Sequence, residues 1–192
     1  DVRTSNLLLD PAEARLMADR RLGIGCDQII LIEPSKIESA LAYLRILNAD
    51  GSASEACGNG TRCVAALLME ETGKSEVVVE TTAGLLRVTE TDDGQFTVNM
   101  GEVRYDWKAI PLAKECDTLH LSIEAGSLID PVAVNIGNPH CVFFVEDVNA
   151  VDLAKLGPKI EHSTLFPERT NVEVASVLDE RNIRMRVWER GV

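Results

Sequence analysis

Residues 48–73 read NADGSASEACGNGTRCVAALLMEETG, and this stretch decides both the fold and the chemistry that the chain can support. Asn48 to Ser52 are residues that favour tight turns, so we predict a turn there. From Thr61 to Glu71 the chain is rich in Ala and Leu, and Gly73 follows, which predicts a largely buried helix that ends at this glycine. Cys57 would then stand at the start of the helix.

A thiol at a helix start lies beside backbone N–H groups that have no partner within the helix. These groups and the positive end of the helix dipole favour the thiolate over the thiol. Gly58 and Gly60 carry no side chains, so we expect a substrate to approach the sulfur closely and to place a carboxylate against the same N–H groups. A base beside a bound carboxylate suits removal of a proton from the adjoining carbon.

The rest of the chain alternates short β-branched or aliphatic runs with turn residues, a pattern typical of strands. The predicted strands are Ile29–Ile32, Leu44–Leu47, Val77–Glu80, Leu85–Thr89, Phe96–Met100, Leu119–Ile123, Val132–Ile136, Val142–Val145, Val172–Val177 and Ile183–Trp188. Two further helices are predicted, over Pro11–Arg21 with Asp10 as N-cap and over Val151–Gly157. We therefore predict an α+β fold in which sheet is wrapped on a central helix.

A weak internal repeat relates the two halves of the chain. In the first half, Gln28 and Asn48 bracket two apolar strands, and in the second half Asn171 and Glu189 bracket two strands in the same way. Cys57 follows Asn48 by nine residues, so the corresponding position after Glu189 would be 198, which lies beyond this sequence. The repeat therefore predicts that a second cysteine segment is missing.

The composition is that of a globular chain of 192 residues, 45% of them hydrophobic. No apolar run approaches the roughly 18 residues of a membrane span. The formal net charge of −12 is spread along the chain without a cluster of Lys and Arg, which argues against nucleic acid and anionic membranes as partners. Five irregularly spaced cysteines fit a reducing compartment, so we predict a cytoplasmic protein, or a plastid protein if a transit peptide was removed.

The segment NADGSASEACGNGTRC, residues 48–63, resembles the first signature of diaminopimelate epimerases. Three later segments resemble further signatures of that family in the same order: Gly137-Asn138-Pro139-His140, Thr170-Asn171-Val172-Glu173 and Glu189-Arg190-Gly191. Proline racemases and their relatives share a two-thiol scheme but typically have His where Asn59 stands. The sequence CGNG therefore favours the diaminopimelate branch.

The resemblance implies two pseudo-symmetric lobes, residues 1–103 and 104–192, each a mostly antiparallel sheet around a central helix, with the second lobe lacking its helix. It implies an isomerase of lysine and peptidoglycan precursor biosynthesis that interconverts LL- and meso-diaminopimelate with no cofactor such as pyridoxal phosphate. The sequence itself holds no evidence for a metal site. Cys57 would be one of two thiols acting on opposite sides of the α-carbon, and His140 and Glu189 would assist proton transfer. Substrate binding is implied for Gln28, Asn48, Gly58, Asn59, Asn138, Asn171, Glu189 and Arg190.

The chain departs from the family at both ends. No Gly-Asn-Asp-Phe segment precedes Asp1, and the Ala-Cys-Gly-Thr-Gly segment with the second thiol does not occur after Gly191. One thiol can exchange a proton but cannot readily invert a centre, so we expect the truncated chain to be inactive as an epimerase. Three alternatives stay open: a non-catalytic remnant that serves as a binding module, a proline racemase-like enzyme, and a related isomerase. A homodimer also stays open.

Several residues have an ordinary structural reading. Cys26, Cys63, Cys116 and Cys141 are expected to be packing or loop residues, and His120 and His162 to have no chemical role. Adjacent residues of a strand point to opposite faces, so Glu189 and Arg190 could bind one substrate only if the backbone turns there. The two GxG segments, at 23–25 and 58–60, lack the further features of a dinucleotide fingerprint, so nucleotide binding is rejected.

Overall fold

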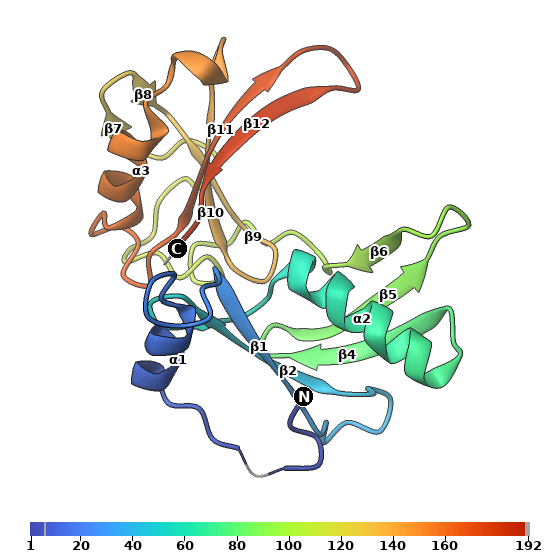
Figure 1. The fold of residues 1–192 in the computed structure, drawn as a ribbon. Helices are drawn as coiled ribbons and strands as arrows, with labels where there is room; N and C mark the ends of the chain where they lie inside the picture. Colours follow the sequence, from blue (N-terminus) through green and yellow to red (C-terminus); the bar gives the residue numbers. More distant parts are fainter. Residues whose placement is uncertain (6, 191–192) are drawn as a thin grey trace. The chain divides into compact units, whose positions relative to one another are not determined.

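The computed structural model describes residues 1–5 and 7–190, which divide into two compact units, residues 1–101 (unit 1) and residues 102–190 (unit 2) (Figure 1). Unit 1 contains α1 (Pro11–Ala18), β1 (Gln28–Glu33), β2 (Tyr43–Asn48), β3 (Ala53–Ser54), α2 (Gly58–Thr72), β4 (Glu76–Thr81), β5 (Gly84–Glu90) and β6 (Phe96–Asn99). Unit 2 contains β7 (Glu124–Ala125), β8 (Leu128–Ile129), β9 (Val132–Asn135), β10 (Pro139–Phe144), the 3-10 helix η1 (Val148–Ala150), α3 (Leu153–Glu161), β11 (Asn171–Val177) and β12 (Ile183–Trp188). The predicted α+β class is confirmed. None of the helices in the described part of the chain is long and apolar enough to cross a membrane.

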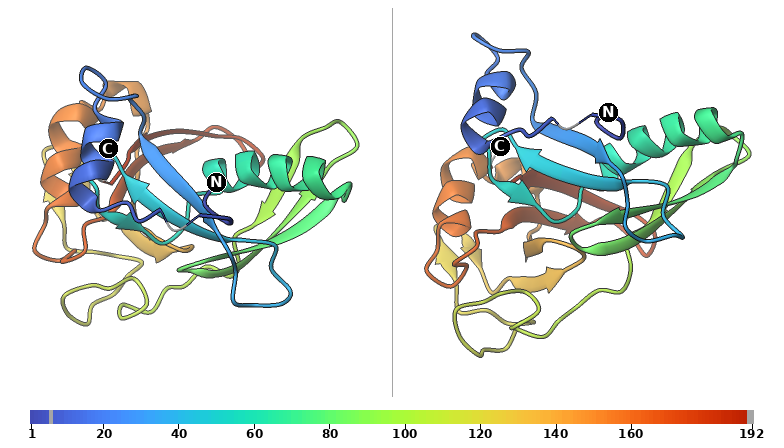
Figure 2. Two further views of the ribbon diagram at one scale, coloured as in Figure 1. Left: turned by 60° about the horizontal axis from the view of Figure 1, so that its bottom comes forward. Right: turned by 90° about the horizontal axis from the view of Figure 1, so that it is seen from below.

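Unit 1 is one sheet with the order β1-β2-β4-β5-β6, to which β3 adds by pairing with β2. Only β2 and β4 run parallel, and the other pairs are antiparallel. Helix α2 lies along one face of this sheet (Figure 2) and buries Val64, Ala65, Leu68 and Met69 in a cluster with apolar residues of β2, β4 and β5. The helix ends as predicted, because Gly73 takes the left-handed conformation (φ 68°) and its N–H donates to Met69 O.

Helix α1 begins as predicted and ends earlier than predicted. The Asp10 carboxylate accepts hydrogen bonds from the N–H groups of Ala12 and Glu13, and the Glu13 carboxylate accepts one from Asp10 N–H, which forms a capping box. The helix stops at Ala18 instead of Arg21, because the Asp19 carboxylate accepts hydrogen bonds from the N–H groups of the two residues at 21 and 22. This local bond draws the backbone into a turn.

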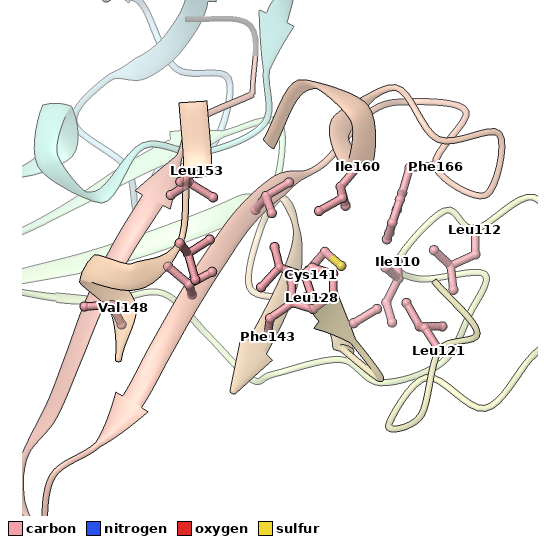
Figure 3. Close-up of a cluster of buried hydrophobic side chains, with 14 residues drawn as sticks. Ile110, Leu112, Leu121, Leu128, Cys141, Phe143, Val148, Leu153, Ile160 and Phe166 are labelled. Atoms are coloured by element: carbon pink, nitrogen blue, oxygen red, sulfur yellow. The ribbon is translucent and has the colours of Figure 1, made fainter. Parts of the chain in front are cut away.

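Unit 2 is built on a four-stranded sheet with the order β12-β11-β10-β9, in which β10 and β11 are parallel. Helix α3 covers one face, where the ring of Trp188 packs against Gly157 so closely that a Cβ there would lie 2.5 Å from it. Figure 3 shows the core on this side, with Phe143 and Cys141 of β10 among aliphatic side chains. Helix α3 begins at Leu153 and ends at Glu161, so it starts and stops later than the predicted helix Val151–Gly157.

Exposed apolar side chains lie on part of the other face of this sheet, beyond its buried residues Asn171 and Glu173. In the strand register Ala175 of β11 pairs with Phe144 and Met185, so these three side chains stand on the same side. Phe144 and Met185 are 58% and 57% exposed. In unit 1 the corresponding apolar surface is covered by α2, whereas no helix among the described residues of unit 2 covers this one.

The internal repeat appears in the strand pairing. In unit 1, Gln28 lies opposite Asn48 at one end of the antiparallel pair β1–β2. In unit 2, the register of the antiparallel pair β11–β12 ends with Val172 opposite Trp188, one position before Asn171 and Glu189. Both repeats therefore form an antiparallel strand pair, and the pairing of the two bracketing residues belongs to the register of unit 1 and not to that of unit 2.

One predicted strand is wrong. Leu119–Ile123 alternates apolar and polar residues, yet it forms no strand: Leu121 is buried, and its N–H donates to Pro131 O outside any ladder, while the Asp117 carboxylate caps Leu119 N–H. A single buried leucine anchors an irregular segment here, and the alternation on either side of it has no partner strand. The small pair β7–β8 and the 3-10 helix were not predicted, since two or three residues give too short a pattern.

Candidate functional site

Cys57 lies at the first turn of α2 in unit 1. It is the N-cap residue, with φ −144° and ψ 103°, and its carbonyl oxygen accepts a hydrogen bond from Thr61 N–H at 2.9 Å. The residue is partly buried and packs against the core cluster under α2, and its Sγ atom accepts a hydrogen bond from Gly60 N–H at 3.3 Å. The sulfur thus takes the place of the oxygen in a Ser or Asp cap, where a negative charge is stabilised by the helix start. The predicted position at the start of the helix is confirmed.

The two glycines after Cys57 have different surroundings. A Cβ atom on Gly60 would lie 2.1 Å from Cδ1 of Ile30 in β1, whereas a Cβ atom on Gly58 would meet only the sulfur of Met100, at 3.5 Å. We expected both glycines to give a substrate access to the sulfur. For Gly60 this is wrong, because Ile30 fills the space that the missing side chain leaves. Only Gly58 keeps the predicted role of leaving room beside the thiol.

Gln28 and Asn48 meet across the β1–β2 pair. The Nε2 atom of Gln28 donates to Oδ1 of Asn48 at 2.9 Å, and Nδ2 of Asn48 donates to Oγ of Ser52 at 3.1 Å. Asn48 is only 2% exposed, so its amide is held between a strand and the turn that precedes Cys57. The structure brings these two predicted substrate-binding residues together, and Gln28 is the more accessible of the two.

The first turn of α2 carries two further polar side chains. Asn59 is exposed, and its Oδ1 atom accepts a hydrogen bond from the guanidinium of Arg62, one turn along the helix. Thr61 is fully buried, and its Oγ1 atom has no hydrogen-bond partner among the described residues. Asn59 is therefore the polar side chain of this turn that a ligand can reach.

In unit 2, both ring nitrogens of His140 have partners. Nδ1 lies 2.7 Å from Oε1 of Glu173, and Nε2 lies 2.7 Å from Oδ1 of Asn138. His140 and Glu173 stand on the same face of the sheet, because β10 and β11 are parallel and His140 pairs with Asn171, two residues before Glu173. The side chain of His140 is 20% exposed and that of Glu173 is 5% exposed. Two predicted site residues, Asn138 and His140, are thus in direct contact.

Asn171 and Arg190 are joined at the end of the same sheet. The Asn171 amide donates to Pro139 O at 3.0 Å and accepts from the backbone N–H of Arg190 at 2.9 Å. Strand β12 ends at Trp188, after which Glu189 is exposed and Arg190 is buried, with its guanidinium donating to Glu168 O. The strand does not continue through Glu189 and Arg190, so the condition for the expected opposite orientation of their side chains is not met. Asn171 fixes the backbone that carries both residues.

The remaining thiols differ from one another. Cys141 is buried in the core of unit 2 (Figure 3). This burial strongly raises the pKa of its thiol, as does the nearby Glu173 to a smaller extent. Burial also raises the pKa of Cys116. Cys63 was expected to pack inside, and this is wrong, because it lies on the exposed face of α2. Within the described ranges 1–5 and 7–190, no group of three or more His, Cys, Asp or Glu side chains could hold a metal ion.

No functional role was predicted from the sequence for Glu173, which lies beside His140. It lies in an apolar strand, two residues after Asn171 and therefore on the same face of the sheet. An acidic residue inside the run Val172-Glu173-Val174-Ala175 is unusual enough to be a signal, because a carboxylate is rarely buried without a partner. The partner itself could not be known without the register of β10 and β11.

The fold is shared with solved structures of the proline racemase type. A probable proline racemase from Agrobacterium radiobacter superposes with a TM-score of 0.67 at 20% identity, over 93% of this chain and 59% of that one. A hydroxyproline epimerase from Agrobacterium vitis superposes with a TM-score of 0.65 at 18% identity, over 92% of this chain and 56% of that one. At such identities the likeness defines the class of fold and no substrate.

The sequence identifies the family within that class. The family model described as Diaminopimelate epimerase matches residues 1–105 and 132–192. The diaminopimelate epimerase of Rhodospirillum centenum is 56% identical over 191 residues, which cover 100% of this chain and 66% of the relative. The diaminopimelate epimerase of Sphingopyxis alaskensis is 53% identical over 192 residues, which cover 100% of this chain and 69% of the relative. The chain belongs to the diaminopimelate epimerase family, and it spans about two thirds of the length of these curated relatives.

Proposed function

We propose that this chain is part of a cofactor-independent epimerase that interconverts LL- and meso-diaminopimelate. The observation that carries the proposal is Cys57, a partly exposed residue at the N-cap of α2 whose sulfur is hydrogen-bonded to a backbone N–H, in a chain of this family. The substrate is taken from the relatives, which are named diaminopimelate epimerase at 56% and 53% identity.

In the proposed reaction, the Cys57 thiolate takes the proton from the α-carbon of the amino acid. An S–H bond forms, and the electron pair of the broken C–H bond spreads onto the α-carboxylate. The N–H groups of Gly58 and Asn59 lie in the first turn of α2, where a helix offers no internal acceptors. They can therefore bind the carboxylate as its charge grows, which lowers the barrier.

Inversion requires a proton to return on the opposite side of the α-carbon. We propose that a second thiol, carried by a helix outside this sequence, supplies it. Two observations support this: the relatives are longer than this chain, and Phe144 and Met185 are exposed on a face of the β9–β12 sheet that no described helix of unit 2 covers. His140 and Glu189 are proposed to assist this second proton transfer.

The proposed substrate-binding residues fall into two groups by their exposure. Direct contact with the substrate is proposed for the accessible ones, namely Gln28, Gly58, Asn59, Asn138 and Glu189. Asn48, Asn171 and Arg190 are buried, and the amides of Asn48 and Asn171 are already held by hydrogen bonds. For these three we propose an indirect role, in which they hold in place the neighbouring backbone that contacts the substrate.

We further propose a cytoplasmic location, a small-molecule substrate as the partner, and no binding of nucleic acid or membranes. A homodimer is to be tested by light scattering.

The test is deuterium incorporation from heavy water into the α-position of LL-diaminopimelate by the product of the complete gene, followed by NMR. We expect incorporation together with formation of the meso isomer, and no incorporation into proline. Incorporation into proline but not into diaminopimelate would reassign the substrate, and incorporation into neither would reject the proposal. Residues 1–192 alone, assayed beside the complete protein, should form no meso isomer because the second proton donor is missing.

A further inference from the structure

The two partners of His140 differ in what they can accept and donate. An ionised carboxylate has acceptors only, so the contact of 2.7 Å between Nδ1 and Oε1 of Glu173 requires a hydrogen on Nδ1. The amide of Asn138, at 2.7 Å from Nε2, has an acceptor and a donor that exchange places on a half-turn. It can accept from Nε2 when that nitrogen carries a proton and donate to it when the nitrogen is bare.

We infer that Glu173 is the positioning residue of His140: it fixes the proton on Nδ1 and leaves Nε2 as the nitrogen that gains and loses a proton. The role in catalysis rests on the proposed function, whereas the assignment of the tautomer does not. When Nε2 accepts a proton, the ring becomes positive, and the adjacent carboxylate offsets that charge without moving.

The burial of Glu173 supports this role. Its side chain is 5% exposed, and its Oε2 atom is buried without a hydrogen-bond partner among the described residues. A half-satisfied buried carboxylate is costly, and a structural role alone would be met more cheaply by an apolar residue such as the valines beside it in β11. The strand register also fixes the geometry, since His140 and Glu173 sit on adjacent parallel strands.

The sharpest test is the ¹⁵N NMR spectrum of histidine-labelled protein. In the complete protein, the signal that disappears in His140→Asn is assigned to His140. We expect neutral His140 to carry its proton on Nδ1. Glu173→Gln, whose amide can accept or donate, should give a mixture of the two tautomers, and Glu173→Leu should release the ring to the Nε2–H form. A proton on Nε2 in the unsubstituted protein, or a spectrum unchanged in both variants, would overturn the inference. If Glu173→Leu does not fold, Glu173→Gln decides.

A double-mutant cycle in the complete protein separates positioning from structure. Glu173→Gln should lower kcat by at least about 10-fold and by no more than the roughly 10²–10⁴-fold that a general acid or base contributes, and should leave KM nearly unchanged. In a His140→Asn background the same substitution should cost nothing further, because its effect passes through the imidazole. Equal losses in both backgrounds would contradict the inference.

The matched control is Glu161→Gln. Glu161 is also a buried carboxylate of unit 2 that accepts a hydrogen bond from a ring N–H, that of Trp188 at 2.7 Å. Neutralising it should leave the His140 tautomer unchanged and kcat within about twofold. If the complete protein lacks epimerase activity, the proposed function fails, while the NMR experiment still decides the relationship between Glu173 and His140.

Discussion

The Cδ1 atom of Ile30 lies where a side chain on Gly60 would have to be. A Cβ atom built on Gly60 would be only 2.1 Å from this Cδ1 atom. Ile30 belongs to β1 and packs against the core under α2, so the strand and the first turn of the helix lie in direct contact at this point. Because Gly60 also donates its N–H to the Cys57 sulfur, the same contact sets the position of the thiol. The packing of β1 is thus coupled to the geometry of the candidate site.

The first prediction follows from this contact. Gly60→Ala should lower the free energy of unfolding by about 1–3 kcal/mol, since overpacking a filled core costs that much. It should also lower the reactivity of Cys57 by moving the Gly60 N–H away from the sulfur. Urea unfolding and the rate of thiol alkylation measure the two effects.

Two variants control this prediction. Gly58→Ala places its Cβ at 3.5 Å from the Met100 sulfur, an ordinary contact, so its stability should stay within about 1 kcal/mol of the original protein. Adding Ile30→Val to Gly60→Ala removes the clashing methyl group and should recover part of the loss. Equal destabilisation by the two alanines would mean that Ile30 is not the cause.

The second prediction concerns the thiols. Cys141 is fully buried and burial raises its pKa, so it should not react with iodoacetamide in the folded protein at neutral pH. Cys63 is exposed on α2 and should react readily. Mass spectrometry of protein labelled with and without urea measures both. Labelling of Cys141 at the rate of Cys63 in the native protein would contradict the buried position of β10.

The third prediction is a pH dependence. The hydrogen bond to Asp130 raises the pKa of His120 above its usual value near 6.5. Because the pKa of His120 is higher in the folded state than in the unfolded state, its contact with Asp130 stabilises the fold below about pH 6.5. This stabilisation is lost as the pH rises through the folded-state pKa. Because both side chains are exposed, we expect a small effect on stability and a clear one on the titration.

Asp130→Asn should therefore bring the His120 midpoint down towards 6.5 in an NMR titration. A His120 midpoint that does not move in Asp130→Asn would show that the contact is absent in solution.

The start of α2 and the turn before it could be predicted from the sequence, because their signals are local. Cys57 directly precedes two glycines and an Ala/Leu-rich run, and Asp10 directly precedes Pro11, so each helix start rests on neighbouring residues. The end of α1 was harder, since the Asp19 side chain competes for the backbone in a way that composition does not reveal.

The parts that could not be predicted depend on contacts between distant residues. Ile30 fills the space beside Gly60 only because β1 crosses under α2, and Glu173 meets His140 only through the parallel pairing of β10 and β11. Cys63 was expected inside because α2 is apolar on most sides, but a helix on one face of a sheet leaves its far side exposed. Residue spacing cannot supply these pairings.

The most direct test of the central claim replaces one cysteine of α2 at a time in the complete protein and follows deuterium incorporation into LL-diaminopimelate. Cys57→Ser should lower the rate by at least about 10³-fold, because a serine hydroxyl is a far weaker base than a thiolate. Cys63→Ser, on the same helix but exposed and six residues away, should retain the rate within about twofold. Full activity in Cys57→Ser, or equal loss in both variants, would contradict the assignment of Cys57 as the base.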